Sequence, residues 1–222
     1  MAAVHPPESA RDVAVLKRFA RNRAAAAERC ELCGVALGQE HEHLVQPARH
    51  RLVCACTACA ILFSDQGNAA YRRVPRRVVR LDAFALSDAH WEALSIPIGL
   101  AFFFRSSPTG KVTAYYPSPA GATESLLPMA PWADLVAANP RLEQMEPDVE
   151  ALLVNRIAQT RGSAAGAGDG YLVPIDACYG LVGIIRTHWR GFGGGSELWE
   201  HVDQFFAALA ERADRPSRRI DG

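Results

Sequence analysis

The chain has 222 residues, of which 49% are hydrophobic and 22% charged, and its 24 Lys and Arg balance its 24 Asp and Glu. A chain of this length and composition can bury a real core, either in one large domain or in a domain with a small attached module, and it is not globally disordered. The zero net charge supplies no global field toward nucleic acid or an anionic membrane, so we expect neither as a partner.

The first residues of the chain and the length of its apolar runs indicate the cellular compartment of the protein. Residues 1–9 contain no basic stretch followed by an apolar core, so we expect no secretory signal. No uninterrupted apolar run reaches the roughly 18 to 20 residues of a membrane span. We therefore expect a cytoplasmic protein, in which clustered cysteines form a metal site or a redox pair more often than a disulfide framework.

Composition divides the chain into four segments. Ser9 is a suitable N-cap for a helix that runs to about Ala27. The expected segments are an N-terminal tail and helix over 1–28, a cysteine-rich metal-binding module over 29–66, an α+β domain over 67–211, and a polar tail over 212–222.

The module contains five of the six cysteines. The best candidate metal ligands, which form two C-x-x-C pairs, are Cys30, Cys33, Cys56 and Cys59. Two such pairs can each fix two corners of a tetrahedral ion. Gly34 permits the tight knuckle turn after the first pair. Residues 50–63 read as a strand that turns into a short helix, with the second pair at the junction. We therefore expect a treble-clef-like or zinc-ribbon-like module.

Zinc is the expected metal and iron is the alternative. A rubredoxin-type iron site favours two glycine-bearing knuckles, whereas only the first pair is followed by glycine. Cys54 could replace Cys56 as a ligand, be a buried bystander or serve as a redox thiol. His41 and His43 could complete the site, form a second one, or have surface or structural roles. Cys178 is expected in the core.

The first half of the α+β domain predicts a sheet. Residues 71–81 read as an edge strand interrupted at Pro75, with five arginines directed at solvent or at an acidic partner. Residues 87–94 predict a short capped helix. Residues 99–117 predict a β-hairpin with Phe102 to Phe104 at the centre of the core. Residues 118–131 are expected to form a long connector or a functional loop.

The second half predicts mainly helices. The expected elements are helices over 132–138 and 148–158, a short strand over 171–175, a helix capped by Asp176 that runs to about Trp189, and a last helix that begins at Ser196. The expected architecture is thus α+β, with the metal module packed on a small antiparallel sheet and the C-terminal helices covering one face. Phosphate-loop, Gly-x-Ser-x-Gly and strand-preceded dinucleotide motifs are missing, so we assign no catalytic residue.

Several stretches together resemble a bacterial, chiefly actinobacterial, family of unassigned function. They comprise residues 30–33, 41–44, 52–63, 96–104, 116–128, 174–179 and 188–191, and they are spread over nearly the whole chain. Members of that family are often encoded near high-affinity nickel–iron hydrogenases. The resemblance implies an accessory role with a hydrogenase subunit or maturation factor as partner, although gene neighbourhood is an association and no mechanism.

The resemblance also directs attention to a candidate functional surface outside the module. Its residues are Ser118, Thr123, Glu124, Ser125, Asp176, His188 and Arg190. Three hypotheses follow. The first is a non-catalytic zinc-binding accessory protein of hydrogenase assembly or maturation. The second is a redox protein that uses iron or reactive thiols at the cysteine cluster. The third is an enzyme in which the 117–128 loop forms a pocket with Asp176 or His188.

Overall fold

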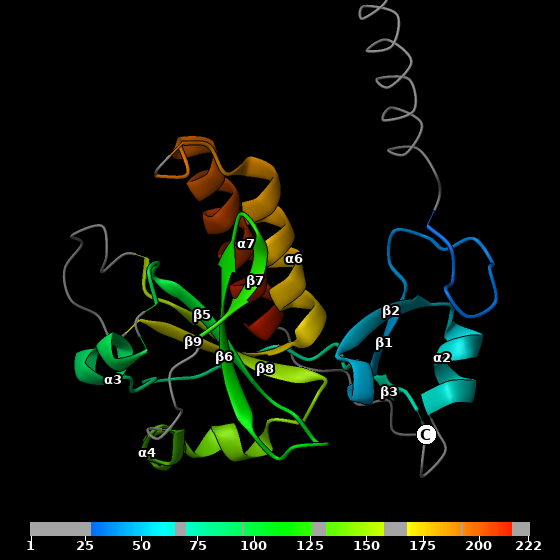
Figure 1. Ribbon diagram of the computed structural model, residues 1–222, viewed down its shortest axis with the longest axis horizontal. Coiled ribbons are helices and arrows are strands. Elements are labelled where there is room, and N and C mark those ends of the chain that lie inside the picture. Colours follow the sequence, from blue (N-terminus) through cyan, green and yellow to red (C-terminus); the bar gives the residue numbers. More distant parts are fainter. Residues whose placement is uncertain are drawn as a thin grey trace, which may run out of the picture.

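The structure is a computed structural model that describes residues 28–64, 70–94, 96–125, 132–157, 168–191 and 193–214. The helix expected over 9–27 lies outside the described residues. Two antiparallel sheets and their covering helices lie side by side in Figure 1. The α+β prediction is confirmed. Within the described residues, no helix combines the length and apolar character that crossing a bilayer requires.

The larger sheet has six strands in the order β4-β9-β8-β5-β6-β7. Its strands are β4 (Val79–Arg80), β5 (Leu100–Arg105), β6 (Val112–Ser118), β7 (Gly121–Glu124), β8 (Glu150–Asn155) and β9 (Asp169–Pro174). The described helices that accompany it are α3 (Asp88–Ala93), α4 (Trp132–Ala138), the 3-10 helix η2 (Pro140–Gln144), α6 (Ile175–His188) and α7 (Ser196–Asp214).

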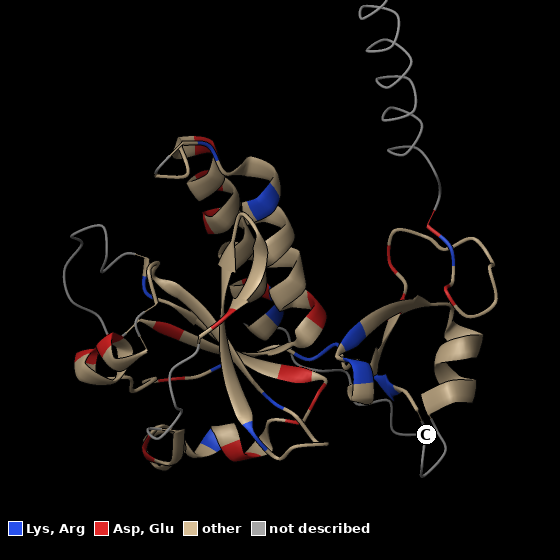
Figure 2. Ribbon diagram, viewed as in Figure 1, with Lys and Arg blue, Asp and Glu red and all other residues tan. Residues whose placement is uncertain are grey.

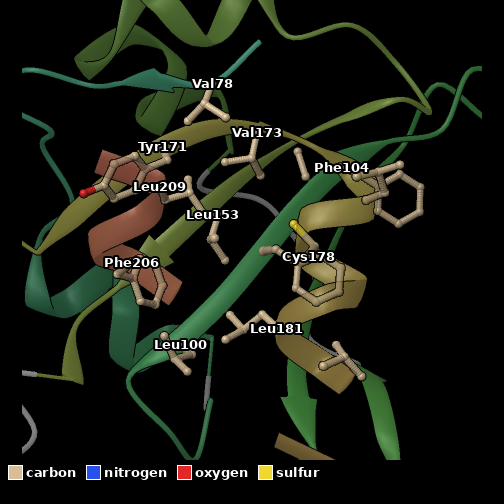
Figure 3. Close-up of a cluster of buried hydrophobic side chains, with 14 of the residues drawn as sticks. Val78, Leu100, Phe104, Leu153, Tyr171, Val173, Cys178, Leu181, Phe206 and Leu209 are labelled. Carbon is tan, nitrogen blue, oxygen red and sulfur yellow. The ribbon is translucent and has the colours of Figure 1, made fainter. Parts of the chain in front are cut away.

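Strand β5 lies between two hydrophobic cores. Phe102 and Phe104 pack on one face with apolar residues of α6 and α7, and Figure 3 shows part of this cluster, including Cys178. Phe103 packs on the opposite face with residues around α3, α4 and η2. A strand covered on both faces needs apolar side chains at successive positions, which explains the run of three phenylalanines. The C-terminal helices cover one face as expected, and the shorter helices cover the other.

Several predicted elements are confirmed. The hairpin over 99–117 is β5 paired with β6. Ser87 caps α3 by accepting a hydrogen bond from the backbone N–H of His90 at 3.2 Å. Helix α4 spans the predicted residues, and α7 begins at Ser196 and continues to Asp214.

Three local predictions are wrong. Residues 148–158, predicted as a helix, contain β8, whose residues are buried on both faces. The predicted connector over 118–131 contains the last residue of β6 and all of β7, which pair with each other, and its residues 126–131 lie outside the described residues. Asp176 does not cap α6, because the N-cap position is Pro174 and no side chain there accepts a capping hydrogen bond. Its carboxylate instead contacts His43, a residue 133 positions away.

The predicted edge strand over 71–81, here called the arginine segment, is two short strands in different sheets. Strand β3 (Arg72–Arg73) pairs with β1 (Glu42–Gln46) of the smaller sheet, and β4 pairs with β9 of the larger one. Pro75 lies between them, where no ladder hydrogen bond is needed. The arginine segment therefore joins the two sheets.

The arginines of this segment, expected to face solvent or an acidic partner, form ion pairs with carboxylates of the same chain. The ion pairs are Arg72–Asp148, Arg73–Glu42, Arg76–Glu42, Arg77–Glu150 and Arg80–Asp169. Glu42 is only 7% exposed and Glu150 is fully buried. Burying a carboxylate is costly unless a cation pairs with it, and the arginines meet that requirement. Basic and acidic residues are accordingly interspersed in the view of Figure 2.

The smaller sheet and α2 (Thr57–Ser64) form the cysteine-rich module. Its strand order is β2-β1-β3, with β2 at Arg51–Ala55 and the 3-10 helix η1 (Pro47–Arg49) joining β1 to β2. Figure 1 shows this module beside the six-stranded sheet and near the start of α6. One face of the β1–β2 hairpin packs against α2 through Leu44 and Val53. The other face carries Val45 and Leu52, which join the core beneath α6.

Candidate metal centre

The first cysteine pair lies on a knuckle turn. The backbone N–H of Gly34 donates to the carbonyl of Cys30 at 2.8 Å, and the N–H of Cys30 donates to the carbonyl of Val35 at 2.8 Å. Gly34 has φ +78°, a left-handed conformation that side chains disfavour. The turn therefore requires the glycine that follows the second cysteine of the pair.

The second pair lies where β2 becomes α2, as the sequence predicts. Cys56 directly follows the strand and Cys59 lies in the first turn of the helix. The backbone N–H of Cys59 contacts the sulfur of Cys56 at 3.5 Å. The helix start therefore places a backbone N–H group beside the Cys56 sulfur.

The fold brings these two pairs together although 22 residues separate them along the chain. The four sulfurs of Cys30, Cys33, Cys56 and Cys59 all lie within 4.8 Å of one another. Cys30 and Cys59 are buried, whereas Cys33 is exposed. No disulfide joins them, and the sulfurs of Cys33 and Cys56 are 3.8 Å apart. This cluster, called the four-cysteine centre below, could hold a metal ion.

The thiols of the four-cysteine centre ionise unequally. Burial opposes ionisation of Cys30, but N–H donors from Cys56, Cys33 and Leu32 outweigh it and lower its pKa to about 6. Burial and the neighbouring thiols raise the pKa of Cys59 to about 12. The pKa of Cys33 is also raised: the Val35 backbone N–H acts to lower it, and the thiols of Cys30 and Cys56 outweigh that. A metal ion that binds at this centre would displace thiol protons, because the thiolate is the form that coordinates.

Cys54 lies outside this centre. Its sulfur instead groups with one ring nitrogen each of His41 and His43, again within 4.8 Å. Cys54 and His43 are direct partners across the β1–β2 ladder. The backbone N–H of Cys54 donates to Glu31 at 2.9 Å. Burial and the charges of Glu28, Glu31 and Cys30 raise the pKa of the Cys54 thiol.

The candidate residues on β6 and β7 bond mainly to their own hairpin. The hydroxyls of Ser118 and Thr123 are 2.9 Å apart, and the Tyr115 hydroxyl donates to Glu124 at 3.4 Å. The Ser125 hydroxyl donates to the carbonyl of Leu94 at 3.1 Å. These contacts fasten the hairpin and do not assemble a reactive group.

The candidate residues of α6 lie at its two ends. Asp176 is in the first turn and His188 is the last residue, so a helix rise of 1.5 Å per residue separates them by about 18 Å. Arg190 donates to the carbonyls of Thr187 and Trp189. The hypothesis of an enzyme with one pocket requires these residues to converge with the 117–128 loop. Asp176 and His188 lie at opposite ends of α6, and residues 126–128 of the loop lie outside the described residues, so this hypothesis stays a prediction.

His188 belongs to a local group that the sequence reasoning missed. Its Nδ1 lies 3.4 Å from a carboxylate oxygen of Glu197, and its ring stacks on His201 with centroids 3.9 Å apart. Glu197 and His201 are four residues apart on α7, so they share a face. That spacing was the available signal. The sequence carries no signal for the contact of His43 with Asp176, because these two residues are 133 positions apart and meet only in the folded chain.

Comparison with known proteins gives one match. The model of a family described as a family of unknown function, DUF5947, matches residues 29–213. The chain belongs to this family. The comparison found no matching curated protein and no matching solved structure.

Proposed function

We propose that this DUF5947 protein binds one zinc ion at the four-cysteine centre and acts as a non-catalytic accessory protein for a protein partner. The observation that carries the proposal is the meeting of four cysteine sulfurs from a knuckle and a helix start. All four corners of a tetrahedral ion are then filled by protein, which is typical of structural zinc and leaves no position for substrate. The knuckle, hairpin and helix start support a treble-clef-like classification of the module.

Elemental analysis of the purified full chain tests the metal. We expect one zinc retained at the four-cysteine centre in the wild type and loss of that zinc in Cys30→Ser. Cys178→Ser is the matched control, because Cys178 is buried in the domain core and should not change the zinc content. A preparation made without chelator or oxidation that contains no metal would refute the proposal.

Iron is the alternative occupant, because the same four thiolates can bind it. Only the first pair has a glycine knuckle with positive φ, which supports zinc. A visible absorption spectrum distinguishes iron from zinc at this centre. Tetrathiolate iron absorbs visible light and zinc does not, so a coloured protein with one iron per chain would establish a redox centre in place of a structural one.

The partner is proposed to be a nickel–iron hydrogenase subunit or one of its maturation factors. This part rests on the sequence resemblance. A surface suited to a protein partner is present on the module, where Ile61, Leu62 and Phe63 of α2 are exposed. Consecutive exposed apolar side chains on a short helix are costly in water and are used in protein interfaces.

Co-purification from the native host tests the partner. We expect the full chain to retain a hydrogenase subunit or maturation factor, and Leu62→Asp to lose it while keeping its zinc. Glu200→Lys on α7 is a matched control, since it changes charge on an element outside the module. Equal retention of hydrogenase proteins by the wild type and Leu62→Asp would contradict the proposed surface, and their absence from the wild-type preparation would contradict the hydrogenase role.

A further inference from the structure

A second group of metal-ligating side chains lies on the opposite face of the β1–β2 hairpin from the four-cysteine centre. In a strand, alternate residues share a face and cross-strand partners lie next to one another. His43 and Cys54 are such partners, whereas the neighbouring pair Leu44 and Val53 faces α2 and the four-cysteine centre. His41 precedes β1 and contributes a ring whose centroid is 4.7 Å from that of His43.

Hydrogen bonds leave the same nitrogen of each histidine available. His41 Nδ1 lies 3.0 Å from the carbonyl oxygen of Gly38, which can only accept, so this nitrogen carries the proton. His43 Nδ1 lies 2.8 Å from the Asp176 carboxylate and donates to it in the same way. In a neutral imidazole the other nitrogen, Nε2, then presents a lone pair.

The Nε2 atom of His41 has no hydrogen-bond partner although it is buried. The side chain of His41 is only 7% exposed. A buried polar atom without a partner costs free energy, and native proteins tolerate it where the atom has another use. Here one ring nitrogen each of His41 and His43 and the sulfur of Cys54 lie within 4.8 Å of one another, so the use that fits is coordination of an ion.

The Asp176 contact strengthens this interpretation. Histidines that bind metal commonly donate their other ring N–H to a carboxylate or a carbonyl, which fixes the tautomer and the ring orientation. Both forms occur here, with Asp176 behind His43 and the Gly38 carbonyl behind His41. Asp176 comes from α6 of the larger domain, so an ion at this position would tie the module to that domain.

We infer that His41, His43 and Cys54 form a second metal site, which takes a divalent first-row transition metal ion, zinc foremost, and keeps one coordination position open. Two imidazoles and one thiolate suit such ions, and three protein ligands leave the fourth tetrahedral corner to water or another ligand. The site shares no ligand with the four-cysteine centre. Its open position makes it the place where an ion can be exchanged or can act on a bound molecule.

Titration of the reduced, metal-free full chain with zinc tests the site. We expect the wild type to bind two equivalents, and His41→Ala and Cys54→Ser to bind one. His90→Ala is the matched control and should bind two, because His90 lies on α3 away from both groups. Asp176→Asn should keep two equivalents but bind one of them about 10- to 100-fold more weakly, as expected when the carboxylate behind a ligating histidine is removed.

Retention of the first equivalent in each variant shows that the module still folds. Alkylation gives an independent readout: in the wild type, the second equivalent of zinc should protect Cys54 from iodoacetamide, as detected by mass spectrometry. The inference is overturned if the wild type binds a single equivalent, if His41→Ala and Cys54→Ser still bind two, or if the variants lose both equivalents together. Zinc at the four-cysteine centre is tested separately, with the Cys30→Ser variant. Failure of the second site therefore does not refute zinc at the four-cysteine centre.

Discussion

The ion pair between Arg77 and Glu150 offers a sharp test of how the arginine segment holds the structure. The Glu150 side chain is fully buried. Its carboxylate receives two bonds from the Arg77 guanidinium, at 2.5 and 2.7 Å, and one from the backbone N–H of Glu146, at 2.9 Å. Arg77→Met removes the only cation among these three bonds and leaves a buried charge with one amide donor.

The magnitude follows from that geometry. Breaking a buried pair by removing one partner costs about 3 to 5 kcal/mol, a large part of the roughly 5 to 15 kcal/mol by which a domain is stable. Arg76→Met is the matched control. Arg76 is mostly exposed, and its partner Glu42 keeps both bonds from Arg73, so we expect a loss below about 1 kcal/mol.

Urea denaturation followed by circular dichroism measures both changes. The double variant Arg77→Met, Glu150→Gln should recover much of the loss, because the glutamine amide carries no charge and still accepts from the Glu146 N–H. If Arg77→Met and Arg76→Met lose the same free energy of unfolding, or if the double variant is less stable than Arg77→Met, the reasoning from the buried charge is wrong.

Three further outcomes are expected. Chelation of the proposed zinc should make residues 30–63 sensitive to protease before the six-stranded sheet. The described core of this module has only six buried residues, and structural zinc typically contributes about 10 kcal/mol to the folding free energy of a small module. Simultaneous digestion of the module and the sheet would contradict this. Burial and Glu124 raise the pKa of Tyr115 to about 12, so the folded state keeps a proton that the unfolded state loses above pH 10. Stability should therefore fall from pH 10 to 12, and Tyr115→Phe should reduce that slope in thermal melts. In Gly99→Ala the new methyl would lie 2.8 Å from the backbone of Arg156, so urea unfolding should show a loss of about 1 to 3 kcal/mol; an unchanged midpoint would refute the contact.

The sequence alone identified the elements whose causes are local. The C-x-x-C spacing and Gly34 predict a knuckle because both act within a few residues. The hairpin over 99–117 follows from two β-forming runs and a turn. Ser87 predicts its cap because the hydrogen bond that it accepts comes from a residue three positions away.

The sequence misjudged elements whose surroundings lie far along the chain. Strand β8 is apolar at successive positions because both of its faces are covered, and such a run cannot be told from a buried helix by periodicity. Asp176 has the composition of a helix cap, yet a histidine 133 residues away takes its carboxylate. The five arginines were expected to face solvent or an acidic partner, and the carboxylates that they pair with lie in the same chain.

Cys54 shows most clearly what the sequence determines and what the tertiary structure decides. By sequence it could be a substitute for Cys56, a buried bystander or a redox thiol, because alternate residues of a strand that continued through Ala55 would place Cys54 and Cys56 on the same face. The tertiary structure ends β2 at Ala55, turns Cys56 toward the first pair, and leaves Cys54 facing two histidines. Ligand types were thus readable from the sequence, but the side of the hairpin on which each ligand lies depends on where the strand ends and which core covers each face.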